Sequence, residues 1–284
     1  MAAAAIVEAE AACRYLDELM EALACCFFRV EPRWQARKYV RALMSDLPRK
    51  NCWAIAEHAG DATPDRMQRL LERARWETMA AMGKIRRFVI GHLVSERAVA
   101  VLDESGQEKK GTATVGVKRQ YVGCAGRVSN AINIVYCTYA TPSGHALVGA
   151  RPYLPAEWAA DPGRREAARV PENIGFATKP ELGRAILADL HAEDVLPPWV
   201  TGDEVYGRDP RLRAWLEDHD TGYVLGIPKS MPIAFAPGVN DRADTVLKAL
   251  TKRDWTIDSC GKGSKGDRCY AWAWVATVHP AVTC

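Results

Sequence analysis

Two aspartates stand at the ends of short apolar runs, where a carboxylate can do chemistry. Asp103 ends the run AVAVLD, and Asp203 ends the run WVTGD. In an open α/β sheet, the ends of buried strands form the edge at which ligand sites are built. A carboxylate there is costly to bury unless a cation meets it. Two carboxylates on neighbouring strands can share divalent cations about 3.5–4 Å apart.

Such a pair of cations would support phosphoryl transfer, because one activates a water or a 3′-hydroxyl and the other stabilises the leaving oxygen. Glu104 and Glu204 follow the two aspartates. Successive side chains of a strand point to opposite faces, so the members of each acidic pair need not share a metal. Aspartates in these positions more often cap a turn or a helix. Spacing alone leaves both interpretations open.

The elements that must position these acids begin near residue 97. Residues 127–139 and 145–153 are apolar or alternating, and the turn sequence TPSG between them predicts a hairpin. Helices are predicted over 180–191 and 208–219, and further strands over 98–103, 199–203 and 223–227. This order of three strands, helix, strand, helix and strand predicts an α/β fold with a mixed sheet flanked by helices.

The first 95 residues have the apolar spacing of helices throughout. Gly60 marks the end of one helix, and Pro64 the start of the next. On that second helix, Arg66, Arg69 and Arg73 lie on a different face from the apolar stripe. The pair has the spacing of a helix-turn-helix, which would place an arginine-bearing helix in a DNA groove. Helical hairpins that only pack are commoner, so that alternative stays open.

The net charge is only +3, but the basic residues are clustered. Residues 29–50 hold seven basic residues against two acids, and residues 109–127 hold five and no acid. Such stretches suit a phosphate backbone as partner, although charge alone favours the simpler explanation of an exposed solvated face.

The remaining composition is ordinary, with 48% hydrophobic and 26% charged residues. No window approaches the roughly 18 consecutive apolar residues that a membrane helix needs, so we expect no membrane partner. Nine cysteines at irregular spacing do not form a disulfide framework. We expect reduced thiols in a cytoplasmic protein.

Several long segments resemble bacterial insertion-sequence transposases of the DDE superfamily. The segment VLDESGQEKKGTATVGVKRQYVGCAGRVSNA is similar to the first catalytic block of that family. The other matching segments occur in the family's order and are RKNCWAIAEHAG, YLPAEWAADPGRR, FATKPELG, WVTGDEVYG and GKGSKGDRCYAWAWV. Together they extend from about residue 30 to 275.

The resemblance implies a ribonuclease-H-like catalytic core over residues 96–284. The helical residues 1–95 would form a separate domain before it, for which DNA binding and simple packing both stay open. The resemblance maps the first two catalytic carboxylates onto Asp103 and Asp203, which would bind Mg²⁺ or Mn²⁺. The implied activity is cleavage at transposon ends and strand transfer. The implied partners are double-stranded DNA, both transposon ends and target, and a second copy of the chain, because the substrate has two ends. The implied location is the bacterial cytoplasm, at the nucleoid.

The same resemblance places several basic residues near the DNA path as phosphate contacts. These are Lys109, Lys110, Lys118 and Arg119. The loop from Gly261 to Gly266 carries Lys262 and Lys265 and could approach a backbone closely, because glycine removes steric bulk. The alternative for this loop is a plain exposed hairpin turn.

One departure from the family concerns the third carboxylate, a Glu in a downstream segment that begins Arg-Trp and contains Ile-Glu-Glu. That segment does not occur before Cys284, so we expect a chain truncated at its C-terminus, with weak metal binding and slow or absent catalysis. Three functions remain open: an impaired transposase, a non-catalytic DNA-binding remnant, and a scaffold protein that binds no DNA. Salt-sensitive DNA binding without cleavage would indicate the second.

Overall fold

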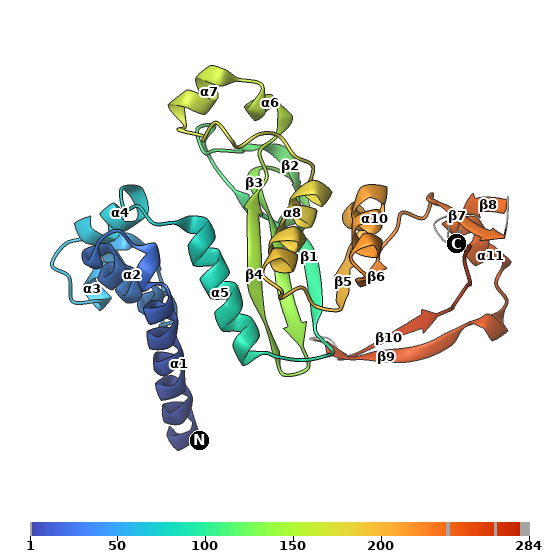
Figure 1. The fold of residues 1–284 in the computed structure, drawn as a ribbon, viewed down its shortest axis with the longest axis horizontal. Helices are drawn as coiled ribbons and strands as arrows, with labels where there is room; N and C mark the ends of the chain where they lie inside the picture. The colour runs from blue at the N-terminus through green and yellow to red at the C-terminus, as the bar shows by residue number, and fades with distance from the viewer. Residues whose placement is uncertain (1, 237–238, 264–265, 279–284) are drawn as a thin grey trace. The chain divides into compact units, whose positions relative to one another are not determined.

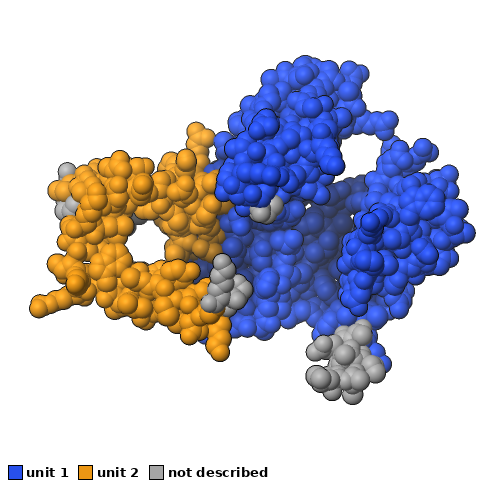
Figure 2. All heavy atoms as spheres, turned by 180° about the vertical axis from the view of Figure 1, so that it is seen from behind, with its two compact units in different colours: residues 1–200 blue, residues 201–284 orange. Residues whose placement is uncertain are grey.

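The computed structural model describes residues 2–236, 239–263 and 266–278. Figure 1 shows the order of its helices and strands. The chain divides into two compact units, residues 1–200 and 201–284 (Figure 2). The division falls inside one short strand, β5 (Trp199–Gly202).

Unit 1 begins with helices only, as predicted. One apolar cluster buries Leu16, Met20, Leu23 and Cys26 and packs against α5 residues such as Ile85. A second cluster joins the next three helices. The elements are α1 (Ala2–Ala22), η1 (Ala24–Cys26), α2 (Val30–Leu43), α3 (Cys52–His58), α4 (Asp65–Glu72) and α5 (Thr78–His92).

A mixed sheet of six strands follows, in the order β2-β3-β1-β5-β6, with β4 also paired to β3. Strands β1 and β3 are antiparallel and pair over their full overlap, from Val99↔Ala140 to Glu108↔Ala131. The sheet is ribonuclease-H-like, and the predicted fold class is confirmed. Its strands are β1 (Val99–Glu108), β2 (Lys118–Val122), β3 (Arg127–Thr141), β4 (Gly144–Pro152), β5 (Trp199–Gly202) and β6 (Gly222–Leu225), with η2 (Gly123–Ala125) after β2.

The predicted hairpin is formed by β3 and β4. Thr141 and Gly144 pair at its closed end, where the Thr141 hydroxyl donates to the Gly144 carbonyl at 3.1 Å. The strands pair back to Ile134↔Pro152, with one bulge after Cys137. The hairpin predicted from the turn sequence is therefore confirmed.

Helix α8 (Lys179–Ala192) covers one face of the sheet. It starts with a reciprocal capping box between Thr178 and Glu181. Its apolar face buries Ile186, Leu187 and Leu190 completely. Opposite Ile186 stands Gly149 of β4, whose missing side chain leaves room for the isoleucine. This close approach seats the helix on the hairpin.

Two short helices, α6 (Ala156–Ala159) and α7 (Pro162–Ala167), form a small cluster of their own. Trp158 is fully buried among Val117 and Leu154, and its indole Nε1 donates to the Val117 carbonyl at 2.8 Å. The Arg164 guanidinium lies 3.6 Å above the Trp158 ring. The cluster thus ties the loop before β2 to the segment after β4.

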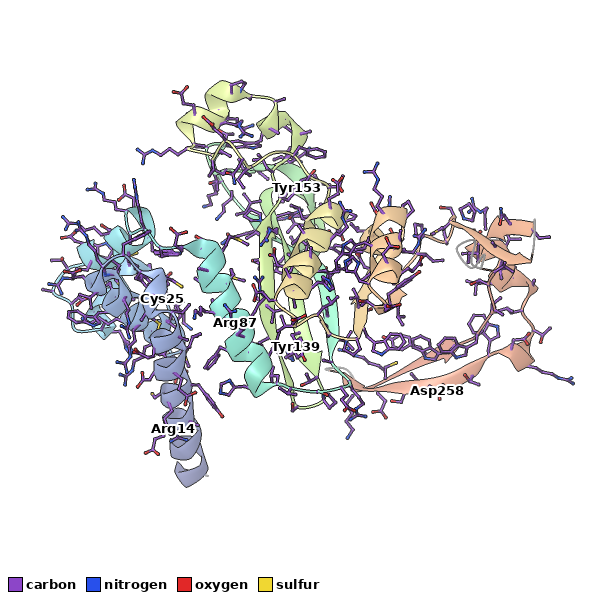
Figure 3. All side chains as sticks on the ribbon, viewed as in Figure 1. Arg14, Cys25, Arg87, Tyr139, Tyr153 and Asp258 are labelled. Carbon is purple, nitrogen blue, oxygen red and sulfur yellow. The ribbon has the colours of Figure 1, made fainter. Side chains whose placement is uncertain are left out.

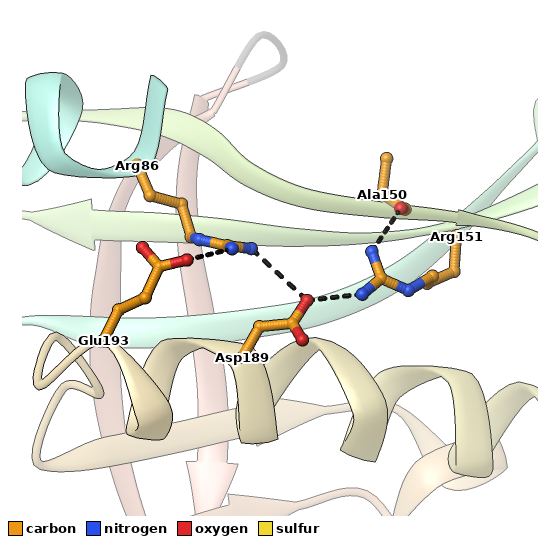
Figure 4. A network of polar contacts seen from close by, with 5 residues as sticks. All are labelled: Arg86, Ala150, Arg151, Asp189 and Glu193. Atoms are coloured by element: carbon orange, nitrogen blue, oxygen red, sulfur yellow. Dashed lines mark hydrogen bonds and ion pairs between the residues drawn. The ribbon is translucent and has the colours of Figure 1, made fainter. Parts of the chain in front are cut away.

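A polar network joins α5, α8 and β4 inside unit 1 (Figure 4). Arg86 is only 2% exposed and pairs with Glu193, and its Nη1 lies 3.5 Å from Asp189. Asp189 also pairs with Arg151, which donates to the Ala150 carbonyl at 3.1 Å. These charges fix the last turns of α8 against α5 and β4.

Unit 2 buries Tyr206, Leu212 and Leu216 around two helices and β6. The strands of two separate two-stranded sheets follow along the chain, and in the second every described side chain of β10 is exposed. The elements are α9 (Glu204–Gly207), α10 (Pro210–Asp218), β7 (Pro232–Ala236), β8 (Val239–Arg242), α11 (Ala243–Ala249), η3 (Lys252–Asp254), β9 (Thr256–Gly263) and β10 (Gly266–Trp272).

Over the described part of the chain, no helix has the length and apolar character needed to cross a membrane.

Candidate active site and DNA-binding surfaces

Asp103 lies in the middle of β1 and not at its end, which corrects the prediction from the apolar run. The strand continues for five residues to Glu108, because pairing with β3 persists through the polar residues. Asp103 is exposed, and its Oδ1 accepts a hydrogen bond from the Glu104 backbone N–H at 2.7 Å. An exposed carboxylate in a central strand therefore replaces the expected strand-end carboxylate.

The two faces of the β1–β3 ladder differ strongly in burial. On the face covered by α8, Ala100, Leu102 and their β3 partners are buried, including Tyr139 at 5% exposed (labelled in Figure 3). On the opposite face lie Asp103 and its partner Tyr136, and none of the β1 and β3 side chains there is buried. We call these the covered face and the second face. Asp103 thus projects from the face that α8 leaves accessible.

Glu104 points to the covered face, as strand alternation requires. Its Oε1 lies 2.5 Å from Lys179 Nζ, and the side chains are 19% and 23% exposed. The two adjacent acids of β1 therefore have different partners. Cys137, buried on the same face, has its thiol pKa raised to about 12 by desolvation.

Asp203 follows β5 directly, as predicted, and is exposed. Its Oδ1 accepts from the Val205 N–H at 2.9 Å, so it also caps α9. The helix-cap interpretation therefore describes its local geometry. Gly226 backs this turn: a Cβ there would stand 3.3 Å from the Asp203 Cα. The strand order makes β5 the neighbour of β1 in the sheet.

Carboxylate oxygens are the ligands that Mg²⁺ and Mn²⁺ prefer, and Asp103 and Asp203 each supply them at an exposed position. Each carboxylate uses one oxygen for a backbone N–H. The donor chemistry of each carboxylate fits a divalent cation. Within the described residues, no group of three or more His, Cys, Asp or Glu side chains is placed to hold one.

The two helices predicted on either side of Gly60 are α3 and α4. Ile55 and Ala56 of α3 and Met67 of α4 are fully buried together with Ala42 of α2. Gly60 in the turn has φ +73°, a left-handed conformation that glycine adopts without strain. All three predicted arginines are exposed: Arg66 and Arg69 on α4, and Arg73 immediately after it.

A buried carboxylate holds this turn against α2. The Asp61 side chain is 5% exposed and accepts from Lys38 Nζ at 2.5 Å and from Gln35 Nε2 at 2.7 Å. The pKa of Asp61 lies below its ordinary value, mainly because of the hydrogen bond from Lys38. The contact ties the turn before α4 to α2. Sequence patterns gave no signal for it.

The predicted phosphate contacts near β1 and β2 have different surroundings. Lys110 and Arg119 are exposed, and Lys109 Nζ donates to Gln107 Oε1 at 2.9 Å. Lys118 instead pairs with Glu157 of α6 at 2.9 Å, which lowers the Glu157 pKa. Neighbouring strand residues point to opposite faces, so Lys118 and Arg119 diverge.

The glycine-rich loop predicted over Gly261–Gly266 falls where β9 is followed by β10, and the described residues of these two strands pair antiparallel up to Gly263↔Gly266. Lys262 is exposed on β9 and pairs in register with Asp267. Lys265 lies outside the described residues. The hairpin geometry agrees with the simple alternative for this loop, and a DNA contact there stays a prediction.

The fold and site together define a class: a ribonuclease-H-like sheet with an exposed carboxylate in its central strand β1. Residues 22–241 match the sequence profile of the DDE superfamily endonucleases, well over half of the chain. The chain belongs to this superfamily. It is 22% identical over 280 residues to the probable transposase for insertion sequence element IS701 of Microchaete diplosiphon, an alignment that covers 94% of this chain and 68% of that protein.

Proposed function

We propose that this protein is a DNA transposase that cleaves DNA at the ends of a mobile element and joins those ends to target DNA. The observation that carries the proposal is Asp103, an exposed carboxylate on the second face of β1 in a DDE-superfamily chain. The similarity to a probable transposase supports the same activity.

In this proposal, Asp103 and Asp203 hold Mg²⁺ or Mn²⁺. The bound cations would supply Lewis-acid activation of a water or 3′-hydroxyl and stabilisation of the leaving oxygen. Asp203 is presented by the capped turn between β5 and α9, which its hydrogen bond to Val205 keeps in one conformation. On β1 the ion pair with Lys179 engages Glu104, so Asp103 is the metal-binding acid of that strand.

We assign two ligands, Asp103 and Asp203, which are the positions that the family resemblance identifies. The second candidate function is a DNA-binding protein derived from a transposase, which occupies transposon ends without cutting them. The exposed arginines of α4 and its end, Arg66, Arg69 and Arg73, favour it.

DNA binding is assigned first to α3 and α4. Their buried core leaves Arg66, Arg69 and Arg73 exposed on one side, the arrangement that carries a recognition helix into a major groove. The exposed Lys110 and Arg119 would add phosphate contacts near the sheet. Double-stranded DNA is the proposed partner, together with a second copy of the chain for the second end, at the nucleoid of the bacterial cytoplasm.

The test is nicking of a labelled duplex that carries the element's own ends, with Mn²⁺, by the wild-type chain and by the Asp103→Asn and Asp203→Asn variants. Mn²⁺ binding is measured in parallel by electron paramagnetic resonance. We expect slow, site-specific nicking by the wild type that each substitution abolishes, together with weaker Mn²⁺ binding by each variant. The substitutions remove no buried contact, so the variants remain folded.

Binding of the same duplex at increasing salt separates the two candidates. Salt-sensitive binding without nicking would support the non-catalytic DNA-binding protein. Loss of binding in the Arg66→Ala, Arg69→Ala double variant would support the assignment to α4. A wild-type chain that neither binds nor nicks the duplex overturns both functions.

A further inference from the structure

A chain of contacts runs from the first residue of α8 to the proposed metal ligand. Lys179 Nζ lies 2.5 Å from Glu104 Oε1, and both side chains are less than a quarter exposed, which limits screening by water. The start of α8 is rigid, because the Thr178–Glu181 capping box closes its first turn. The Glu104 side chain is therefore held by a residue of α8, outside its own strand.

The contact continues from Glu104 to Asp103 through the backbone. The Glu104 N–H donates to Asp103 Oδ1 at 2.7 Å, which orients the carboxylate on the second face. The Glu104 side chain is anchored on the covered face. A rotation of the strand that moved one residue would therefore have to break the contact of the other.

We infer that Lys179 and Glu104 are positioning residues, which fix the orientation of the Asp103 carboxylate through the Glu104 backbone N–H. The inference rests on the proposed function, in which Asp103 is a metal ligand. Partners that orient a ligand in this way typically change metal affinity by about 10- to 100-fold when they are lost.

Charge and position predict opposite effects for the loss of Lys179. Lys179→Met removes a positive charge near the site, which by Coulomb's law should strengthen the binding of a cation. If Lys179 positions Asp103, the same substitution removes the Lys179 contact of Glu104 and weakens cation binding. The sign of the change in Mn²⁺ affinity therefore distinguishes the two effects.

The experiment measures Mn²⁺ dissociation constants of the full chain by electron paramagnetic resonance, and amide hydrogen exchange around Glu104 without metal. The variants are Lys179→Met, the conservative Lys179→Arg, and the charge-reversed pair Lys179→Glu with Glu104→Lys. The control is Lys248→Met, an exposed lysine of α11 to which no role in binding is assigned. Urea denaturation of each variant measures its stability separately.

We expect Lys179→Met to weaken Mn²⁺ binding about tenfold and to speed exchange at Glu104, with Lys179→Arg and the reversed pair within about threefold of wild type. Unchanged or tighter Mn²⁺ binding by Lys179→Met, with or without lower stability, overturns the inference and leaves the pair only structural. If Asp103→Asn itself binds Mn²⁺ like the wild type, the proposed function fails instead, which is a distinct result.

Discussion

The buried guanidinium of Arg86 offers a direct test of how α8 is held on the sheet. The side chain is 2% exposed, whereas its partners Glu193 and Asp189 are 21% and 28% exposed. Substitution to methionine keeps most of the volume but leaves Glu193 without its cation. Asp189 keeps its ion pair with Arg151, so Glu193 is the carboxylate that is left without a cationic partner.

The expected cost follows from the burial of the pair. Breaking a buried ion pair by removing one partner costs about 3–5 kcal/mol, because the remaining charge is desolvated. Glu193 keeps some contact with water, so we expect the lower end for Arg86→Met, about 3 kcal/mol. With a urea m-value of about 2 kcal/mol/M, the midpoint for unit 1 should fall by about 1.5 M.

Two further variants show whether the cause is the unpaired charge. Arg37→Met breaks an exposed pair with Asp17, whose side chains are 49% and 52% exposed, and should cost less than about 1 kcal/mol. Adding Glu193→Met to Arg86→Met should recover more than half of the lost stability, since no carboxylate is then stranded. A midpoint shift below about 0.5 M for Arg86→Met, or a double variant less stable than the single one, would refute this reasoning.

Three other outcomes are expected. Gly149→Ala should cost about 1–3 kcal/mol, because its Cβ would overlap Ile186; urea denaturation should show a much smaller cost in an Ile186→Ala background, and additive costs would contradict the packing. Asp61 stabilises α2–α4 fully above the ordinary carboxyl pKa of about 4. Because its folded pKa is lowered by Lys38, that stability is lost as the pH falls toward the lower value. Circular dichroism should therefore show that the stability of Asp61→Asn falls less steeply at acid pH than that of the wild type. The same dependence on pH in both proteins would contradict this role of Asp61. Cys137, with its pKa raised to about 12, should resist iodoacetamide at about pH 8 while exposed cysteines react, as mass spectrometry of the folded chain can check.

Much of the fold follows from local patterns. Apolar spacing predicted the N-terminal helices, and a turn signal predicted the β3–β4 hairpin, because both depend on residues close in sequence. The predicted end of β1 at Asp103 was wrong, because the strand continues to Glu108. Hydrophobicity stops at Asp103, but the hydrogen-bonded ladder with β3 continues to Glu108. Pairing between distant strands, not side-chain polarity, decides where such a strand ends.

The candidate site was only partly predictable for the same reason. Asp103 and Asp203 were identified from the apolar runs before them, together with family resemblance. Lys179, which pairs with Glu104, lies 75 positions away, and no spacing rule connects them. The cluster around Trp158 was also missed, because its partners come from segments on either side of the β3–β4 hairpin.

The shortness of β2 has a consequence for how accurately this protein must fold. The strand has five residues, and Gln120 fixes its register by donating to the Ala131 carbonyl at 2.7 Å and accepting from Asn133 at 3.0 Å. A slip of one residue would exchange Lys118 and Arg119 between the faces of the sheet. The slipped molecule would keep the same composition, charge and nearly the same secondary structure, yet Lys118 would lose its ion pair with Glu157. Correct folding here thus depends on the pairing register of β2 with β3. Spectroscopic measurements of helix and strand content would not reveal an error in that register.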